Sequence, residues 1–238
     1  LTKSYGKHRG IENLTYSVLP GEIFGFIGPN GAGKTTTIRT LMGLLKPTSG
    51  NATIFGLDCT QHAAEIAKNV GYLPSENCYY NNLKVKEQLQ YTADLYGVNC
   101  HDRIEDLAER LNLDLSRKIG DLSLGNKKKV GIVSALLPSP KLLILDEPTS
   151  QLDPIAASDF LETVRKINRD IGTTVILTEH RLQDVIPWAD KVYVLDQGGL
   201  LTQGTPGEIG EFLKEKHHGM FLSMPVPMQI YAEVESDL

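Results

Sequence analysis

The sequence has few cysteines and no long hydrophobic run. Its three cysteines, Cys59, Cys78 and Cys100, lie far apart and form no CxxC or Cys/His pattern. That spacing argues against a disulfide framework or a zinc site, so free thiols in a reducing compartment are expected. No run approaches the ~18 apolar residues that a helix needs to span a bilayer, and no signal peptide is visible.

A surplus of positive charge is also absent. Lysine and arginine number 24 against 29 aspartates and glutamates, which gives a formal net charge of -5. No overall basic field favours nucleic acid, so we expect no nucleic-acid partner. The short lysine run at 127–129 is interpreted as a solvated face. The chain does not start with Met and ends without a helix cap, so we expect the native protein to continue at both ends.

Apolar runs separated by turns indicate an α/β organisation. Residues 22–27, a glycine-rich turn and a helix-compatible stretch at 34–43 are expected to form a strand, a loop and a helix. Further apolar runs indicate strands at 51–55, 70–73, 142–145, 174–177 and 192–195, and a short helix at 63–68. Strands that alternate with helices predict a mainly parallel sheet covered on both faces.

The pattern changes between residues 79 and 125. Mainly apolar side chains recur there at helical spacing, and no convincing strand occurs; they are Val85, Leu89, Thr92, Leu95, Tyr96, Ile104, Leu107, Leu111 and Leu115. We therefore expect one domain, 1–238, with a helical lobe (79–125) inserted into an α/β core (1–78 and 126–218) that also has a small antiparallel β part. The tail, 219–238, has a strand-like end and an open role.

Residues 28–35 fit the pattern GxxxxGK followed by Ser or Thr, between a predicted strand and a predicted helix. Glycines let backbone N–H groups turn inward around a polyphosphate, and the helix N-terminus adds unpaired N–H groups. We expect Lys34 to bridge the β- and γ-phosphates, Thr35 to ligate Mg²⁺, and Thr36 to lie near the α-phosphate. The loop that completes this nucleotide site consists of Gly28, Pro29, Asn30, Gly31, Ala32 and Gly33.

Two acids follow the apolar run at 142–145. Asp146 ends the predicted strand, where a carboxylate can hold Mg²⁺ directly or through water. Glu147, the next residue, is placed to orient or deprotonate an attacking water. Two acids at a strand end are common in isolation, but beside a phosphate loop they favour a catalytic site.

The phosphate loop, the helical segment and the acidic run at 146–150 (DEPTS) resemble, in order and spacing, the nucleotide-binding subunit of ATP-binding cassette (ABC) transporters. The resemblance covers residues 1–210. It implies a P-loop NTPase core and ATP hydrolysis with Mg²⁺. It also implies a head-to-tail dimer with a second ABC ATPase subunit, identical or different, and a separate integral membrane permease. Such a subunit lies peripherally on the cytoplasmic face of the cell membrane.

Other residues match the motifs of that family. Tyr5 resembles the aromatic residue that stacks on adenine. Residues 122–126 (LSLGN) resemble the signature LSGGQ, in which Ser123 and Gly125 would contact the γ-phosphate bound by the other subunit. Residues 150–153 (SQLD) resemble the dimer-communicating loop.

His180, after the strand predicted at 174–177, resembles the switch histidine that contacts the γ-phosphate. The resemblance therefore implies a catalytic set of Glu147, His180 and Lys34.

Two departures from the family pattern stand out. The signature has Leu124 where glycine is usual and Asn126 where glutamine is usual. The family also has a glutamine that usually follows a proline; here Ser75 follows Pro74. Ser75 would reach Mg²⁺ only through water, and Glu76 could substitute for it. These departures affect hydrolysis and coupling rather than ATP binding.

The direction of transport is ambiguous. Residues 25–137 are similar to subunits that serve exporter-type (ABC-2) permeases, whereas residues from 141 onward are similar to energy-coupling factor ATPases that drive vitamin or metal-ion uptake. The region expected to meet the permease is exporter-like, so export is favoured. Two alternatives of another class are a non-transport ABC protein, acting in DNA repair or on the ribosome, and a nucleotide-binding regulator that no longer hydrolyses ATP.

Overall fold

The computed structural model describes residues 1–6, 8–76, 78–97, 100–180 and 182–235. These residues form two compact units, which are described separately. The first unit comprises Leu1–Ile66 and Thr174–Leu238, and the second comprises Ala67–Thr173.

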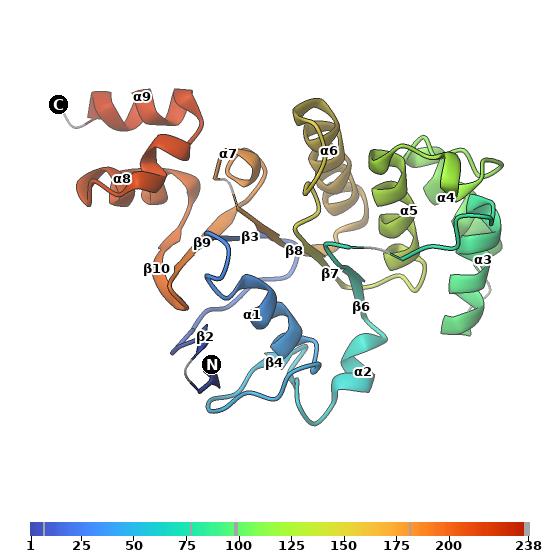
Figure 1. Cartoon of the computed structure of the whole chain (residues 1–238), viewed down its shortest axis with the longest axis horizontal. Coiled ribbons are helices and arrows are strands. Elements are labelled where there is room, and N and C mark those ends of the chain that lie inside the picture. The colour runs from blue at the N-terminus through green and yellow to red at the C-terminus, as the bar shows by residue number, and fades with distance from the viewer. Residues whose placement is uncertain (7, 77, 98–99, 181, 236–238) are drawn as a thin grey trace. The chain divides into compact units, whose positions relative to one another are not determined.

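The sheet of the first unit is mainly parallel (Figure 1). Its strand β3 (Ile23–Ile27) pairs in parallel with β8 (Thr174–Glu179) on one side and with β9 (Lys191–Asp196) on the other. Strand β10 (Gly199–Gly204) adds to β9 in the antiparallel sense. Every residue of β3 is buried, as expected for a strand covered on both faces. Helix α1 (Lys34–Leu41) follows β3, so the predicted strand, loop and helix are confirmed.

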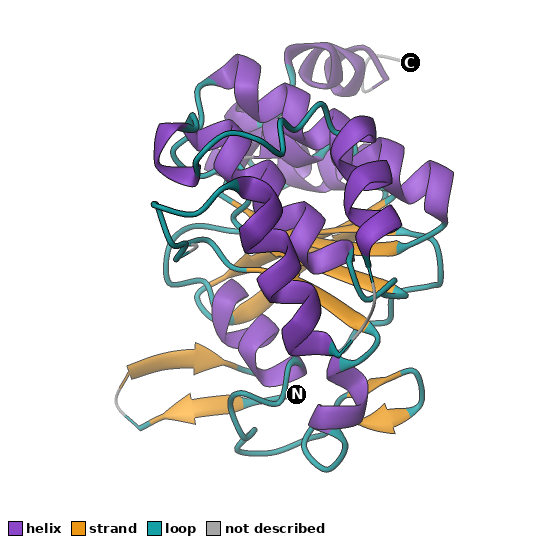
Figure 2. Cartoon of the chain, turned by 90° about the vertical axis from the view of Figure 1, so that its right-hand side faces the viewer, coloured by secondary structure: helices purple, strands orange, loops and turns teal. Residues whose placement is uncertain are grey.

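Two small antiparallel hairpins complete the strands of this unit (Figure 2). One pairs β1 (Lys3–Tyr5) with β2 (His8–Ile11), and the other pairs β4 (Thr53–Ile54) with β5 (Leu57–Asp58). The strand predicted at 51–55 is therefore shorter than expected. Phe55 and Gly56 both have positive φ, 55° and 79°, which is the conformation of a tight hairpin turn.

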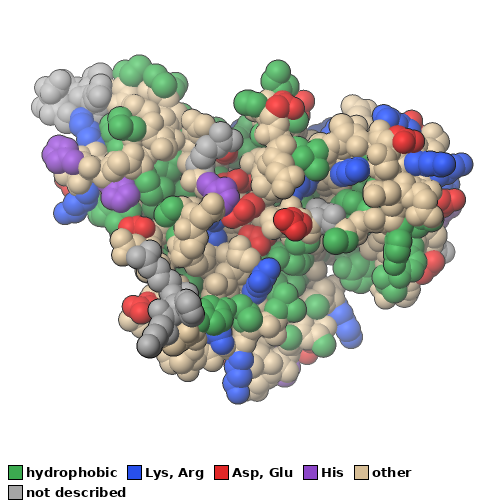
Figure 3. All heavy atoms as spheres, viewed as in Figure 1, with side chains coloured by type: hydrophobic (Ala, Val, Ile, Leu, Met, Phe, Trp, Pro, Cys, Tyr) green, Lys and Arg blue, Asp and Glu red, His purple; other side chains and the backbone are tan. Residues whose placement is uncertain are grey.

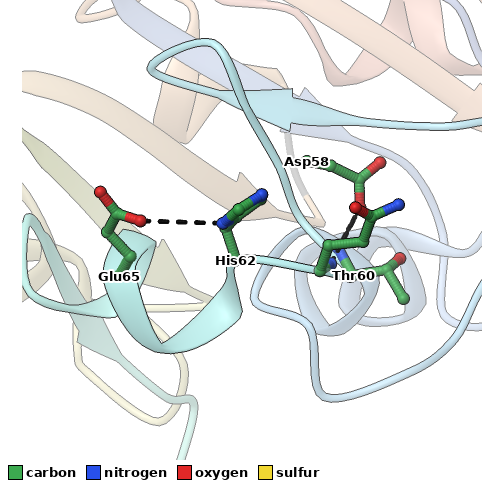
Figure 4. Close-up of polar contacts among 5 residues, drawn as sticks. Asp58, Thr60, His62 and Glu65 are labelled. Carbon is green, nitrogen blue, oxygen red and sulfur yellow. Dashed lines mark hydrogen bonds and ion pairs between the residues drawn. The ribbon is translucent and has the colours of Figure 1, made fainter.

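The connection from β5 to helix α2 (Ala63–Ala67) is held by local polar contacts (Figure 4). The Asp58 carboxylate accepts hydrogen bonds from the backbone N–H groups of Thr60 and Gln61, at 2.8 and 2.9 Å. Cys59, which lies between Asp58 and Thr60 in the chain, is buried. Burial, and then the nearby Asp58 carboxylate, raises the pKa of the Cys59 thiol to about 11.

An aromatic cluster packs against β3 and β9. The ring of Tyr16 lies 5.6 Å from that of Phe24, and 5.0 Å from those of Phe26 and Tyr193, measured between centroids. The Tyr193 hydroxyl donates to the Thr15 carbonyl at 3.0 Å. The Tyr16 hydroxyl is buried and has no hydrogen-bond partner among the described residues, and this burial raises the pKa of Tyr16.

Three segments from distant parts of the chain come into close contact at Gly10, Gly33 and Gly198. The Gly10 carbonyl oxygen would lie 3.3 Å from a Cβ at Gly33 and 2.6 Å from a Cβ at Gly198. The Glu12 N–H also donates to the Gly198 carbonyl at 2.8 Å. The end of the phosphate loop, hairpin β1–β2 and the turn between β9 and β10 therefore meet where only glycine fits.

Helix α7 (Leu182–Val185) lies between β8 and β9 in the first unit. After β10 the unit ends with α8 (Pro206–Glu215), the 3₁₀ helix η2 (Gly219–Ser223) and α9 (Val226–Glu235). The strand-like end expected for the tail is wrong, because Met228 and Gln229 donate to the Pro225 carbonyl and open α9 instead. Hydrophobic side chains are exposed there (Figure 3), namely Leu222, Val226 and Ile230.

The second unit contains a parallel strand pair and the longer helices. Strand β6 (Val70–Leu73) pairs with β7 (Leu142–Asp146) in parallel, with Val70 opposite Leu142. The helices are α3 (Val85–Tyr96), α4 (His101–Arg110), the 3₁₀ helix η1 (Ile119–Asp121), α5 (Leu124–Leu136) and α6 (Pro154–Ile171). The helical spacing at 79–125 thus predicted helices correctly, although Leu95, one of its apolar positions, is exposed.

Candidate functional site

The phosphate loop between β3 and α1 has a backbone shape that requires glycine. Gly31 and Gly33 have φ of 81° and 105°, which side-chain-bearing residues rarely adopt. A Cβ at Gly28 would collide with the Leu195 carbonyl, and one at Gly33 would lie 2.5 Å from Cγ2 of Ile11. The loop is a narrow backbone cradle, as a phosphate site demands.

The N-terminus of α1 faces the end of this loop with backbone donors. Gly33 is the N-cap, and no side chain of the described residues caps the helix there. The first turn of a helix has N–H groups without intrahelical partners, and the helix dipole makes this end positive. Thr35 and Thr36 lie in that turn and are half-buried. These features suit an anion such as a phosphate group.

Lys34 is folded into the loop and reaches His180. Its side chain is only 4% exposed, and its ammonium donates to the carbonyls of Gly28 and Pro29 at 2.8 and 3.3 Å. The ammonium also lies 3.1 Å from Nδ1 of His180. Because an ammonium can only donate, Nδ1 accepts, and a neutral imidazole then carries its proton on Nε2. The structure thus brings together two of the residues predicted to act on phosphate.

The position of His180 follows from the sheet. It comes directly after β8, which ends at Glu179 opposite Ile27, the last residue of β3. The carboxyl ends of neighbouring parallel strands lie at one edge, where ligands bind in α/β folds. The strand predicted at 174–177 is longer than expected, and its two extra residues carry the chain to the phosphate loop.

Tyr5 lies at the end of β1, opposite His8 in the hairpin. Tyr5 is 41% exposed, and the Lys3 ammonium lies 5.3 Å from the ring centroid. That contact is a cation–π interaction on one side of the ring. The hairpin also brings Ile11 against the phosphate loop at Gly33.

The two acids lie in the second unit, at the end of β7. Asp146 is 1% exposed, and Glu147 is half-buried. Glu147 has a φ of 49°, an uncommon left-handed conformation for a residue other than glycine. Such strained positions concentrate at functional sites, and its carbonyl accepts a hydrogen bond from the Ser150 N–H at 3.1 Å.

The loop after β6 contains Ser75, which is half-buried, and Glu76, which is exposed. The Ser75 carbonyl accepts a hydrogen bond of 2.7 Å from the ammonium of Lys128. Lys128 is only 4% exposed, so the solvated face predicted for 127–129 is wrong at this residue. Lys128 precedes Ile132 by one helical turn and shares its buried side of α5, a spacing that the sequence already contained.

The signature-like residues open α5. Ser123 is its N-cap and accepts a hydrogen bond of 3.3 Å from the Asn126 N–H. A Cβ at Gly125 would meet only Cβ of Ala156, at 3.9 Å, so packing among the described residues does not demand glycine there. Leu124 is 39% exposed.

The segment expected to communicate across a dimer starts α6. Gln151 has a φ of 67°. Asp153 is the N-cap, and its carboxylate accepts hydrogen bonds from the N–H groups of Ile155 and Ala156, both at 3.0 Å. Pro154, with its fixed φ, suits the first helical position.

The structure joins some of the predicted site residues directly. Lys34 and His180 are in contact in the first unit, and the hairpin that carries Tyr5 touches the phosphate loop. The remaining predicted residues lie in the second unit; they are Ser75, Glu76, Ser123, Gly125, Asp146 and Glu147. Within the described ranges, every helix is too short or too polar to cross a membrane.

Comparisons with known proteins show the family that this chain resembles. Residues 11–150 match the family model described as ABC transporter. The chain is 38% identical over 205 residues to the bacitracin transport ATP-binding protein BcrA of Bacillus licheniformis, covering 85% of this chain and 67% of that protein. It is 35% identical over 214 residues to the linearmycin resistance ATP-binding protein LnrL of Bacillus subtilis, covering 88% and 68%.

A solved ATP-binding subunit of an ABC transporter is 29% identical, with a TM-score of 0.77 over 98% of this chain and 97% of that one. The family model, the relatives and the fold all indicate an ABC transporter ATP-binding protein. The chain therefore belongs to the ABC transporter family and contains its ATP-binding domain, with a P-loop NTPase fold.

Proposed function

We propose that this chain hydrolyses ATP and that the hydrolysis powers export of a substrate through a separate membrane permease. The observation that carries the proposal is the contact between Lys34 and His180 within a glycine-shaped loop at the edge of the sheet. We expect the Lys34 ammonium, with its three donors, and the switch-like imidazole of His180 to contact the γ-phosphate.

Binding of ATP would use groups of the first unit. The Lys34 ammonium, which now donates to Gly28 and Pro29, would turn its donors to phosphate oxygens. The first-turn N–H groups of α1 would bind the same phosphates. The exposed Tyr5 ring would stack on adenine, because aromatic faces pack well against flat bases.

The residues present suit Mg²⁺, which prefers oxygen ligands. The Thr35 hydroxyl and the Asp146 carboxylate would hold it, with Ser75 acting through water. Bound there, Mg²⁺ supplies positive charge that neutralises the phosphate oxygens.

Hydrolysis needs a group that positions water, and Glu147 fits that role. Its carboxylate would orient the attacking water and accept its proton. The left-handed backbone of Glu147 costs free energy that a purely structural turn could avoid with glycine. His180 and Lys34 would stabilise the charge that builds on the γ-phosphate.

A second ABC ATPase subunit, identical or different, would complete the site. Ser123 is exposed, and Gly125 has room for a methyl group among the described residues. A glycine that internal packing does not require suggests close approach by another molecule. That molecule would be the ATP bound by the partner subunit.

The names of the relatives favour export. BcrA is named for bacitracin transport and LnrL for linearmycin resistance, so an antibiotic or similar compound is the substrate class we propose. The alternative of vitamin or metal-ion uptake is not favoured. The subunit would sit on the cytoplasmic face of the membrane, bound to its permease.

Two variants test the ATPase assignment. Glu147→Gln should abolish turnover and leave ATP binding intact, and Lys34→Ala should lose nucleotide binding. Hydrolysis by Glu147→Gln at the normal rate would refute the role of that carboxylate. A wild-type protein that binds ATP without hydrolysing it, even with its permease, would instead support the regulatory alternative.

Export is tested with the membrane permease that co-purifies with this chain. Cells that express both proteins should tolerate more bacitracin or linearmycin, and cells with the Glu147→Gln variant should not. Equal tolerance in both strains would contradict export of these compounds.

A further inference from the structure

Lys128 is a buried charge to which the proposed chemistry gives no role. It lies on α5, is 4% exposed, and donates to the Ser75 carbonyl at 2.7 Å. Removing an ammonium from water is costly unless its donors are hydrogen bonded. A buried lysine at this position therefore points to a task that an apolar residue could not perform.

The contact fixes the orientation of a whole peptide unit. The carbonyl of Ser75 and the N–H of Glu76 belong to the same planar, trans peptide, so they point in opposite directions. By holding the Ser75 oxygen, Lys128 also sets the direction of the Glu76 N–H. It thereby sets the backbone from which the side chains of Ser75 and Glu76 extend.

A second hydrogen bond joins the loop after β6 to α5. The Tyr79 hydroxyl donates to the Lys127 carbonyl at 3.0 Å, and burial raises the pKa of Tyr79. The Lys127 N–H in turn donates to the Ser123 carbonyl at 2.9 Å, in the first turn of α5. The loop is thus attached to Lys127 and Lys128, which directly follow the signature-like residues 122–126.

We propose that Lys128 is a positioning residue that holds the loop of Ser75 and Glu76 on the first turns of α5. The lysine compensates for the short Ser75 side chain by fixing the backbone that presents it. It also makes the loop and the Ser123 end of α5 move as one body. This inference rests on the proposed ATPase function, in which Ser75 serves the metal and Ser123 the partner's nucleotide.

Hydrogen–deuterium exchange tests whether Lys128 holds the loop on α5, without relying on activity. In Lys128→Met, which keeps the length and removes the charge, the amides at 75, 76 and 78–80 should exchange about tenfold faster, as expected for loss of a hydrogen bond to a charged group. Lys128→Arg should restore much of the protection, and Lys129→Met, a half-buried neighbour, should leave exchange unchanged.

Unchanged exchange at 75, 76 and 78–80 in Lys128→Met would overturn the proposal. An equal increase in β6 and β7 would also overturn it, because it would indicate general destabilisation. If Lys128→Met does not fold, Lys128→Gln provides the measurement. Glutamine is uncharged and shorter than lysine, and unchanged exchange at 75, 76 and 78–80 would equally overturn the proposal.

The Mg²⁺ requirement then separates positioning from a structural role. For Lys128→Met, the Mg²⁺ concentration that gives half-maximal hydrolysis should rise about tenfold, as for residues that orient metal ligands. The affinity for ATP without Mg²⁺ should stay the same. If exchange is faster but the Mg²⁺ requirement is unchanged, Lys128 has only a structural role, and the proposal is overturned. Absence of hydrolysis in the wild type would refute the proposed function, whereas the exchange experiment would still test whether Lys128 holds the loop on α5.

Discussion

Replacing Gly33 with alanine should cost more stability than replacing Gly31, although both glycines have positive φ. The left-handed backbone alone costs an L-residue about 1–2 kcal/mol. A Cβ at Gly31 meets nothing within 4 Å, whereas one at Gly33 lies 2.5 Å from Cγ2 of Ile11, a fully buried side chain. Overpacking of this kind adds about 1–3 kcal/mol. The free energy of unfolding should therefore fall by about 1–2 kcal/mol in Gly31→Ala and about 2–5 kcal/mol in Gly33→Ala.

Urea unfolding followed by circular dichroism measures both values under the same conditions. An Ile11→Ala background supplies the matched control, because it removes the Cγ2 atom and with it the extra cost at Gly33. The coupling energy between positions 11 and 33 should then be about 1–3 kcal/mol. Equal losses for the two glycine variants, within about 0.5 kcal/mol, would refute the reasoning.

Three further predictions concern residues outside the phosphate loop. Tyr16→Phe removes a buried hydroxyl with no partner among the described residues, so the protein should gain about 1 kcal/mol in urea unfolding; a clear loss would reveal a hydrogen bond to water. Asp153→Ala removes the cap of α6 and should cost about 1 kcal/mol by thermal unfolding, with Asp153→Asn recovering most of it. The pKa of Cys59 rises from 9.0 to about 11 in the folded chain, so the unfolded thiol ionises first and stability falls as the pH rises through that range. Cys59→Ala should lack that component, and identical pH profiles would contradict it.

Much of the fold could be predicted because strands and helices leave local patterns. The apolar runs at 22–27 and 142–145 correspond to β3 and β7, and helical spacing identified α3 and α4. Predictions of strands from local sequence failed where a turn or a tertiary contact determined the secondary structure. The turn at Phe55 and Gly56 cut a predicted strand short, and backbone hydrogen bonds to Pro225 began a helix where a strand-like end was expected.

The parts of the candidate site that consist of residues close together in the sequence could be predicted. A glycine-rich loop with a lysine, or two acids after a strand, can be recognised by spacing alone. The contact between Lys34 and His180 joins residues 146 positions apart, and only the parallel pairing of β3 with β8 creates it. The burial of Lys128 was not predicted. Within a run of three lysines, composition alone does not distinguish the one that lies on the buried side of α5.

The close contact at Gly10, Gly33 and Gly198 has a consequence for synthesis of the chain. Protein chains emerge from the ribosome N-terminus first, so the phosphate loop is made long before the turn that contains Gly198. Strands β8 and β9, which flank β3, are made equally late. The nucleotide cradle therefore cannot acquire its final shape until most of the chain has emerged. The loop is short in sequence, but its formation depends on contacts across nearly the whole first unit, and such non-local contacts form slowly.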